Sequence, residues 1–488
     1  MPINHQTHFD LAAAARRSMI EHGFEPDYPP AVAQQLEQLR AHPPAPAKDA
    51  RDLRKLLWSS IDNDTSRDLD QIEYAEALPN GSFRVLIGIA DVDAFVPKGS
   101  PIDAHALRET TTVYTGVEIF SMLPEELSTG STSLLQDQER AAVVVEFTVD
   151  AQAQITASDT YLAQVVNRGQ LAYPSVGAWL DGKAAPPPKL AASEELEQQL
   201  KLQNQIAQLL RKDRARHGAL NLQTIETHPV QLRDGEIDIE AEQKNAATQL
   251  IEDFMIAANG VVARALEAKG RSSIRRVVKT PKRWDRIVEM ARQMGTQLPA
   301  DPDPKPLEDF LCAQQAKDPD HFPDLSLAVI KLLGPGEYVL DKAGEPAEGH
   351  FGLAVHDYTH STAPNRRYAD LVAQRLLKAM IASQPSPYSD DELASVAAQC
   401  TKMEDAERKV SREMQKRIAA VAMSGRIGQA FDAIVTGVNE HGSFVRTIQP
   451  HVEGMLVRGQ QGLDVGDKLR VTLVRTDPVQ GYIDFART

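Results

Sequence analysis

The chain has 488 residues, and its content of 42% apolar and 25% charged residues is typical of a globular protein of about three domains. It contains no run of the ~18 apolar residues that a membrane span needs, and its first residues lack the basic-then-apolar pattern of a signal peptide, so we expect a cytoplasmic protein without membrane contact. The net charge of −15 excludes a uniformly basic surface for nucleic acid, and Cys312 and Cys400 fit neither a disulfide framework nor a zinc site.

Residues 1–50 predict two short helices followed by a stiff linker. Asp10 can cap a helix over 11–22, and Pro30 can open a second helix over 31–40, ahead of the proline-rich stretch 43–46. Two helices joined by a turn are compatible with a helix-turn-helix that contacts nucleic acid. Most such helix pairs, however, are simple packing modules, and this is the alternative that we favour.

An acidic stretch at 60–71 precedes a predicted hairpin and places aspartates at 62, 64, 68 and 70. Like charges this close are tolerated where a hard cation neutralises them, and Mg²⁺ prefers oxygen ligands, so Asp62, Asp68 and Asp70 are candidate metal ligands. A solvated acidic turn is the alternative. A calcium loop fits less well, because an EF-hand needs glycine where this chain has Arg67 and a helix where 71–92 predicts two strands.

From residue 51 the pattern predicts one long mixed domain, with apolar strands at 83–92 and 141–149 and a helix that begins at Ser193. Two of its segments could bind phosphate. The stretch 270–284 is rich in arginine and lysine, and the turn 359–371 combines hydroxyls with Arg366 and Arg367 at a helix start. A solvated face and a structural arginine pair are the respective alternatives.

The C-terminal part predicts a long amphipathic helix over 390–423 and then five short strands between 431 and 485. Short strands at this spacing favour a small OB-type barrel. Phe431, Phe444 and His451 could stack on unpaired bases of a nucleic acid, and each could equally be a core residue.

From about residue 51 to its end, the chain resembles the ribonuclease II family, in which a catalytic RNB domain precedes an S1 RNA-binding domain. Separately each shared motif is weak, but together they follow the family's order. They are RDLR at 51–54, ID at 61–62, DLD at 68–70, IADV at 89–92, MLPEELS at 122–128, LIEDFM at 250–255 and RRYADL at 366–371.

The resemblance implies roles for individual residues. Asp62, Asp68 and Asp70 match the catalytic aspartates that hold Mg²⁺ at the scissile phosphate, and Arg366 matches an arginine that stabilises phosphate charge. Gln71 departs from the family, which has a fourth aspartate there. Its neutral oxygen could still face a metal, but one fewer negative charge should weaken the binding of a second ion.

The resemblance also implies contacts with the nucleotide. Tyr114 matches the aromatic residue that packs on the 3′-terminal base. Glu252 stands where the family has a residue that contacts the nucleotide, and Glu407 where an acidic residue faces the end of the strand. The family commonly carries cold-shock barrels ahead of its RNB domain, whereas residues 1–50 lack the strand alternation for one.

We therefore expect an α+β multidomain protein: a helical segment at 1–50, a mixed α/β RNB domain at 51–423 and an all-β S1 barrel at 424–488. The implied function is that of a Mg²⁺-dependent, processive 3′→5′ exoribonuclease that hydrolyses single-stranded RNA to nucleoside 5′-monophosphates. The expected protein is a monomer that needs no nucleotide cofactor. The alternative is a catalytically impaired RNA-binding protein on the same scaffold.

Overall fold

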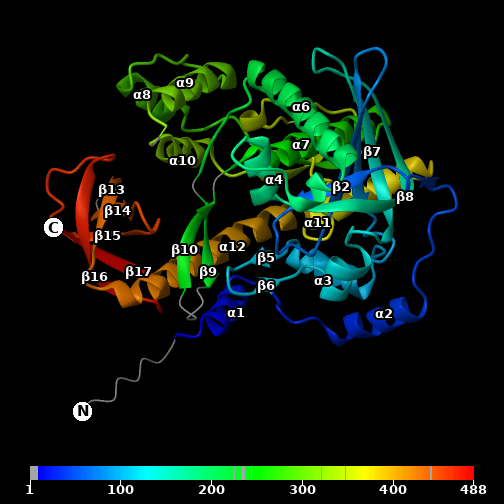
Figure 1. Cartoon of the computed structure of the whole chain (residues 1–488). Helices are drawn as coiled ribbons and strands as arrows, with labels where there is room; N and C mark the ends of the chain where they lie inside the picture. Colours follow the sequence, from blue (N-terminus) through cyan, green and yellow to red (C-terminus); the bar gives the residue numbers. More distant parts are fainter. Residues whose placement is uncertain are drawn as a thin grey trace.

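The computed structural model describes residues 9–224, 226–231, 237–242, 244–319, 321–346, 348–439 and 442–488. Figure 1 shows a large body of mixed helix and sheet, with a small barrel at one side that is joined to the body by the long helix α12 (Asp390–Met423). This arrangement confirms the expected α+β multidomain fold. None of the helices in these ranges is long and apolar enough to cross a membrane.

A six-stranded sheet forms the framework of the body, in the order β1-β8-β2-β3-β4-β7. Its strands are β1 (Arg51–Asp52), β2 (Trp58–Asp62), β3 (Gln71–Ala77), β4 (Phe83–Ala90), β7 (Glu139–Val149) and β8 (Ile155–Ala172). The long strand β8 also pairs with β7, so it links the two ends of the sheet. The predicted strands at 83–92 and 141–149 and the hairpin after the acidic stretch are confirmed.

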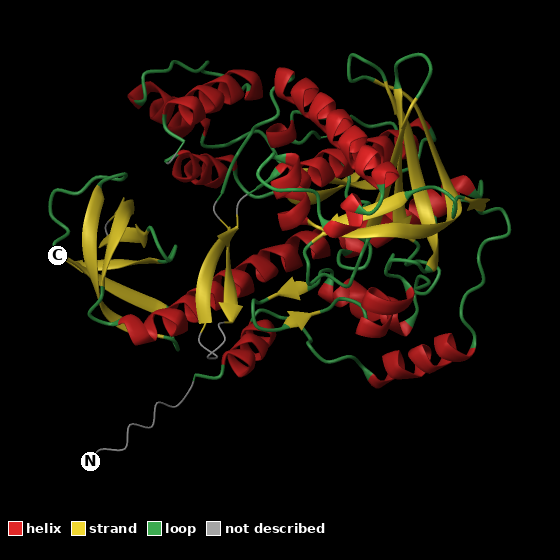
Figure 2. Ribbon diagram, in the orientation of Figure 1, coloured by secondary structure: helices red, strands yellow, loops and turns green. Residues whose placement is uncertain are grey.

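Helices lie over this sheet (Figure 2), and its apolar side chains are buried in one large core. Trp58 and Ile61 of β2 share one core with Phe254 of α7 (Ala246–Ala268) and Leu371 of α11 (Tyr368–Ile381). Ser193 caps α6 (Glu194–Arg216), as predicted, because its side chain accepts a hydrogen bond from the Leu196 amide. The same core includes residues of α3 (Pro101–Glu109), α4 (Tyr173–Leu180) and α5 (Pro188–Ala191).

The two N-terminal helices dock on different elements. Asp10 caps α1 (Leu11–Glu21), which packs against α12 and against the small hairpin of β5 (Val113–Tyr114) and β6 (Ile119–Phe120). Helix α2 (Pro30–Ala41) lies on α3 instead, with Val32 in the main core. Both predicted helices are confirmed, and each serves as a packing element of the body.

Smaller elements complete the chain. They are the π-helical turn η1 (Glu126–Ser131), the strand pairs β9 (Glu226–Gln231) with β10 (Ile237–Glu242) and β11 (Ser273–Val277) with β12 (Glu337–Asp341), the helices α8 (Trp284–Gln293), α9 (Pro304–Lys317) and α10 (Phe322–Leu333), and the 3-10 turns η2 (Phe351–Leu353) and η3 (Ser424–Arg426).

The C-terminal strands form a closed five-stranded barrel, as the sequence predicts, in the order β13-β14-β15-β17-β16. They are β13 (Ala430–Asn439), β14 (Gly442–Thr447), β15 (Glu453–Arg458), β16 (Lys468–Asp477) and β17 (Tyr482–Arg487). The barrel has its own apolar core, centred on Leu456 and Phe485. The end of α12 closes this core with Ala420 and Met423.

Candidate active site

The aspartates of the acidic stretch lie where two neighbouring strands meet. Asp62 ends β2, and Asp70 directly precedes β3, which pairs with β2 in antiparallel fashion. The Asp62 Oδ1 atom accepts hydrogen bonds from the Asn63 amide at 2.7 Å and from the Ser66 hydroxyl at 2.9 Å. The Asp70 Oδ1 atom accepts a bond of 2.9 Å from the Asn365 amide. The loop thus returns on itself and brings both ends of the acidic stretch to one place.

Arg366 faces this group from the turn that leads into α11. Its Nε atom lies 3.6 Å from Asp70 Oδ2, and its side chain is 45% exposed, so the guanidinium can also reach a ligand. Arg367 is different, because it is held by two hydrogen bonds to the buried carboxylate of Asp370. Of the two adjacent arginines, one faces the aspartates and the other fastens the start of the helix.

Tyr114 approaches from the β5–β6 hairpin and contacts the third aspartate. Its hydroxyl donates a hydrogen bond of 3.1 Å to Asp68 Oδ2, while 44% of the residue stays exposed. Glu407 of α12 lies near the same hairpin, because Ser411 Oγ donates to Glu407 at 2.9 Å and contacts the Tyr114 carbonyl oxygen at 3.5 Å. Tyr114 is therefore linked to Asp68 through its side chain and, by way of Ser411, to Glu407 through its backbone.

The electrostatics of the site are dominated by burial of negative charge. Burial raises the pKa of Asp70 to about 8, although the nearby Arg366 guanidinium opposes the shift. Burial also raises the pKa of Asp62, and the neighbouring Asp68 adds to that increase. The pKa of the Tyr114 hydroxyl is raised by burial and by Asp68. One arginine does not compensate these carboxylates.

This excess of buried carboxylate fits a hard divalent cation, which would favour the ionised aspartates. Asp62, Asp68 and Asp70 are the residues that would hold it. In the described ranges, however, no three His, Cys, Asp or Glu side chains converge closely enough to form a complete ligand cage. Waters and a substrate phosphate would therefore have to supply the other ligands, as is usual for Mg²⁺.

Two sequence-predicted residues are less closely tied to this group. Gln71 opens β3 and is half-buried, next in sequence to Asp70. Glu252 lies on α7, is about half-exposed and forms an ion pair of 2.9 Å with Lys244. The metal role of Gln71 and the nucleotide contact of Glu252 stay predictions.

The aromatic candidates in the barrel separate into a core residue and a surface residue. Phe431 is only 9% exposed and packs edge-to-face against Phe485, so it is a core residue and not a stacking platform. Phe444 lies on the outward face of β14 and is half-buried. Of the two, only Phe444 keeps a position from which it could meet a base.

His451 lies in the connection between β14 and β15, beside an ion pair that joins the barrel to the body. Arg446 of β14 donates to both oxygens of Asp324 on α10, at 2.6 and 3.1 Å. Burial and the Arg446 charge lower the pKa of His451, and the Asp324 carboxylate opposes them. The structure thus assigns His451 a place at a domain contact.

Glu73 is a buried carboxyl group near the site that the sequence did not single out. It is fully buried on β3, and neither of its oxygens has a hydrogen-bond partner among the described residues. Burial raises its pKa well above the ordinary value, and Asp62 adds to the shift. A charged residue inside an apolar strand was the available signal, at Ile72-Glu73-Tyr74.

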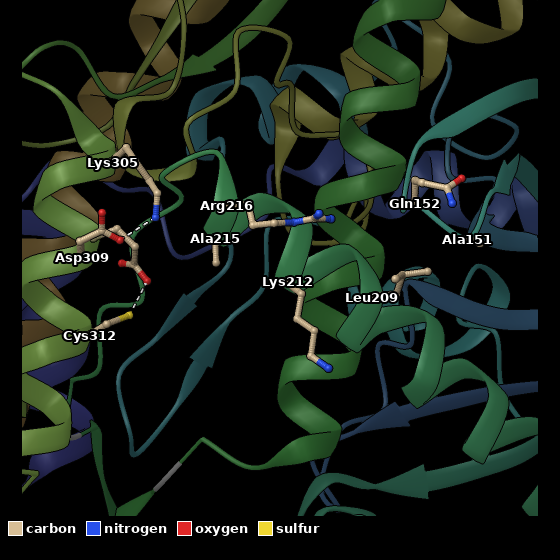
Figure 3. Close-up of a pocket in the computed structure, with 10 residues that line it drawn as sticks. Ala151, Gln152, Leu209, Lys212, Ala215, Arg216, Lys305, Asp309 and Cys312 are labelled. Carbon is tan, nitrogen blue, oxygen red and sulfur yellow. Dashed lines mark hydrogen bonds and ion pairs between the residues drawn. The ribbon is translucent and has the colours of Figure 1, made fainter.

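A separate groove of 640 Å³ lies between α6 and α9 (Figure 3). Lys212 and Arg216 line one side of it, and Lys305 and Cys312 line the other. Lys305 is paired with Asp309 at 2.6 Å, and the Cys312 thiol contacts Glu308 at 3.1 Å. The groove contains none of the residues of the aspartate group.

Comparison with known families defines the class of protein to which this fold and site belong. A model of the RNB domain matches residues 50–383, and a model of the RNase II-type exonuclease C-terminal S1 domain matches residues 429–488. The molecule is therefore a multidomain protein with a large RNB domain and a terminal S1 barrel. The chain belongs to the RNB domain family.

Relatives named ribonuclease R are similar over most of this chain. The protein from Vibrio cholerae is 30% identical over 466 residues, which cover 91% of this chain and 54% of the relative. The Escherichia coli protein is 28% identical over 448 residues, or 88% of this chain and 54% of the relative. The chain thus spans about half the length of these curated relatives.

Two solved structures illustrate the spread of the fold. The apo form of Mycoplasma genitalium RNase R has a TM-score of 0.85 at 24% identity and covers 98% of this chain and 78% of its own. Yeast Ssd1, described as a pseudonuclease, has a TM-score of 0.70 at 17% identity and covers 92% of this chain and 56% of its own. At these identities the similarity concerns the fold alone.

Proposed function

We propose that this protein is a Mg²⁺-dependent 3′→5′ exoribonuclease that hydrolyses single-stranded RNA processively to nucleoside 5′-monophosphates. The observation that carries the proposal is the group formed by Asp70, Arg366 and Tyr114 with Asp68, at the meeting point of β2 and β3. Membership of the RNB family supports it, and so do relatives named ribonuclease R.

The chemistry divides among a few side chains. Asp62, Asp68 and Asp70 would hold the divalent ion, which when bound supplies Lewis-acid polarisation of the phosphate and an activated water. The half-exposed Arg366 offsets the negative charge that develops on the phosphate. The exposed face of Tyr114 stacks on the terminal base, and its hydrogen bond to Asp68 fixes the ring beside the reacting phosphate.

The proposed substrate is a single strand, because backbone charge and stacked faces are common to all four nucleotides. We place Glu407 beside the last nucleotide, since Ser411 links it to the strand of Tyr114. The S1 barrel would gather RNA through the outward face of β14, which carries Phe444. We further propose a cytoplasmic monomer with three parts at 1–50, 51–423 and 424–488.

A second function is an RNA-binding protein that has lost its chemistry. Gln71 favours this alternative, because it replaces an expected carboxylate with a neutral amide. The fold does not decide between the two, since a pseudonuclease shares it. The complete set of three aspartates with Arg366 favours the enzyme.

A product assay separates the two functions. A 5′-labelled single-stranded RNA is incubated with the protein and Mg²⁺, and in parallel with EDTA. The enzyme should release nucleoside 5′-monophosphates and leave one short labelled end product, and EDTA should stop the reaction. Binding of the RNA without any mononucleotide release in Mg²⁺ or Mn²⁺ would establish the alternative.

A further inference from the structure

We propose that the buried segment Thr132-Ser133-Leu134 positions the aspartate loop, and that Ser133 is a positioning residue for the metal site through its hydrogen bonds on both sides of Asp68. The inference rests on the proposed function, since it concerns the aspartates that would hold the ion. The segment has no charge and no place among the motifs that predicted the site. It is identified by its contacts alone.

The Ser133 hydroxyl forms hydrogen bonds with the backbone on both sides of Asp68. It donates to the carbonyl oxygen of Arg67 at 2.6 Å and accepts from the amide of Leu69 at 3.0 Å. The amide of Leu134 adds a third bond, to the Leu69 carbonyl oxygen at 3.0 Å. The backbone immediately before and after Asp68 is therefore fixed to one fully buried serine.

Thr132 is connected to Asp70 through Asn365. The Thr132 hydroxyl lies between two acceptors, the Asn365 side-chain oxygen at 2.6 Å and the Leu127 carbonyl oxygen at 2.7 Å, and the backbone amide of Asn365 donates to Asp70 Oδ1 at 2.9 Å. The side-chain nitrogen of Asn365 has no partner among the described residues, so the hydroxyl of Thr132 is the contact that holds the Asn365 side chain, while the backbone amide of the same residue binds Asp70. The segment 132–134 is thus connected to Asp68 through Ser133, and to Asp70 through Thr132 and Asn365.

Arg140 anchors the segment from behind. Its Nε donates to the Ser133 carbonyl oxygen at 2.9 Å, and Nη2 donates to the Gly130 carbonyl oxygen at 3.1 Å. Its recorded hydrogen bonds in the described part of the chain all go to carbonyl oxygens, and burial lowers its pKa. A half-buried arginine whose hydrogen bonds go to carbonyl oxygens is well suited to hold a backbone turn in place.

The rest of the aspartate loop has little to hold it. Asn63, Asp64 and Thr65 are exposed, so the backbone at Asp68 depends on the buried tether at Ser133, while the Asp68 carboxylate is held by the Tyr114 hydroxyl. Outer contacts of this kind set the orientation of metal ligands, and their loss commonly costs about 10–100-fold in metal affinity or activity. Removing the Ser133 hydroxyl should therefore disturb the metal site while the RNA groove is retained.

The test compares Ser133→Ala with Ser128→Ala, which removes another buried hydroxyl from the same stretch. Ser128 is suitable because its recorded side-chain contact is a long one of 3.5 Å to the Pro124 carbonyl oxygen. Mn²⁺ affinity is measured by electron paramagnetic resonance with a 2′-O-methylated single strand present. RNA affinity, kcat and melting temperature are recorded alongside.

Ser133→Ala should weaken Mn²⁺ binding by about tenfold and lower kcat, with RNA affinity retained, while Ser128→Ala binds Mn²⁺ like the wild type. If Ser133→Ala does not fold, the near-isosteric Thr132→Val serves as the second variant and should weaken Mn²⁺ binding through Asn365. Equal Mn²⁺ affinity in wild type and in the folded variant overturns the inference. Wild-type protein that binds Mn²⁺ without releasing mononucleotides refutes the proposed function instead, and wild-type protein that binds no Mn²⁺ refutes both.

Discussion

At Asp70, burial raises the pKa of the carboxyl group and the nearby Arg366 charge lowers it. Its carboxylate is nearly inaccessible, accepts one amide hydrogen bond and has a single arginine within 3.6 Å, which leaves its pKa raised to about 8. A cation that binds there would compete with a proton, so its binding would release protons near neutral pH. A bound cation would thus offset the buried charge of Asp70 that Arg366 alone does not.

Tyr114 combines two functions that one pair of substitutions can separate. Tyr114→Phe keeps the ring but removes the hydrogen bond to Asp68, whereas Tyr114→Ala removes both. We expect Phe to preserve the length of the final undigested fragment and Ala to lengthen it, because base stacking contributes about 1–3 kcal/mol. Gel analysis of the labelled end product checks this. The same end product for all three proteins would exclude Tyr114 from the site.

Gln71→Asp tests whether this chain has lost a metal ligand. A carboxylate at that position should strengthen the binding of a divalent ion if the side chain faces the aspartate group, because hard cations prefer charged oxygen ligands. A Mg²⁺ titration of the cleavage rate should shift to lower concentration, and Gln71→Glu provides the length control. An unchanged titration for both would mean that Gln71 lies outside the ligand shell.

The sequence predicted the charged members of the site but not their neighbours. Aspartates at 62, 68 and 70 stand out because repelling charges need a reason to be close. Ser133 gave no such signal, since a buried serine is common and only its contacts reveal a role. The family resemblance singled out Arg366, but the residues alone could show neither that Arg367 is held by Asp370 nor that Phe431 is a core residue, because burial depends on long-range packing.

At the scale of elements, the sequence predicted where helices begin, but it did not predict which elements the helices pack against. Side-chain caps at Asp10 and Ser193 begin helices as expected, because capping depends on residues a few positions apart. That α1 would lie on α12 and support the hairpin of Tyr114 could not be inferred from 1–50 alone. Helix α1 therefore packs on the hairpin that carries Tyr114 and on the helix that carries Glu407.

Glu109, at the end of α3, links this N-terminal segment to the body and predicts a pH effect. Its carboxylate accepts a bond of 2.9 Å from the Glu25 amide, and burial raises its pKa from the ordinary 4.5 to about 7. With a raised pKa, its contribution to stability is full below pH 4.5 and is lost as the pH rises to about 7.

Glu109→Gln removes the loss of stability that ionisation of Glu109 causes at rising pH, and it keeps an acceptor for the Glu25 amide. The variant should match wild type in acid and become more stable than wild type by about 1–3 kcal/mol as the pH rises to neutral. Denaturant unfolding across this range measures the difference. The exposed Glu37→Gln on α2 is the control, and a Glu109→Gln difference that does not change with pH would contradict the assigned shift.

At the scale of the whole molecule, the barrel is attached to the body by α12 and by the contact of Arg446 with Asp324. Arg446 lies on the same outward face of β14 as Phe444, and this strand belongs to the face with which OB-folds bind nucleic acid. Sequence patterns within the barrel could not predict this contact, because its acidic partner lies 122 positions away. Asp324 thus forms an ion pair with Arg446, which could otherwise contact a phosphate of the RNA.

Asp324→Asn should free Arg446 for RNA. Because each neutralised phosphate of a single strand adds about 0.7 to the slope of log affinity against log salt concentration, RNA affinity should rise at low salt and its salt dependence should become steeper by roughly that amount. Filter binding over a salt series measures both. Asp309→Asn, which alters an ion pair of α9, is the control. An identical slope for Asp324→Asn and wild type would show that Arg446 does not reach the strand.

The most direct test of the account is Asp70→Asn, measured for RNA binding and for mononucleotide release in the same preparation. The substitution keeps the shape of the side chain and the acceptor for the Asn365 amide but removes the charge that would hold the ion. We predict unchanged affinity for single-stranded RNA and a loss of mononucleotide release of at least about 100-fold in Mg²⁺. Cleavage at the wild-type rate, or an equal loss of binding and cleavage, would contradict the assignment of Asp70 as a metal ligand of an exoribonuclease.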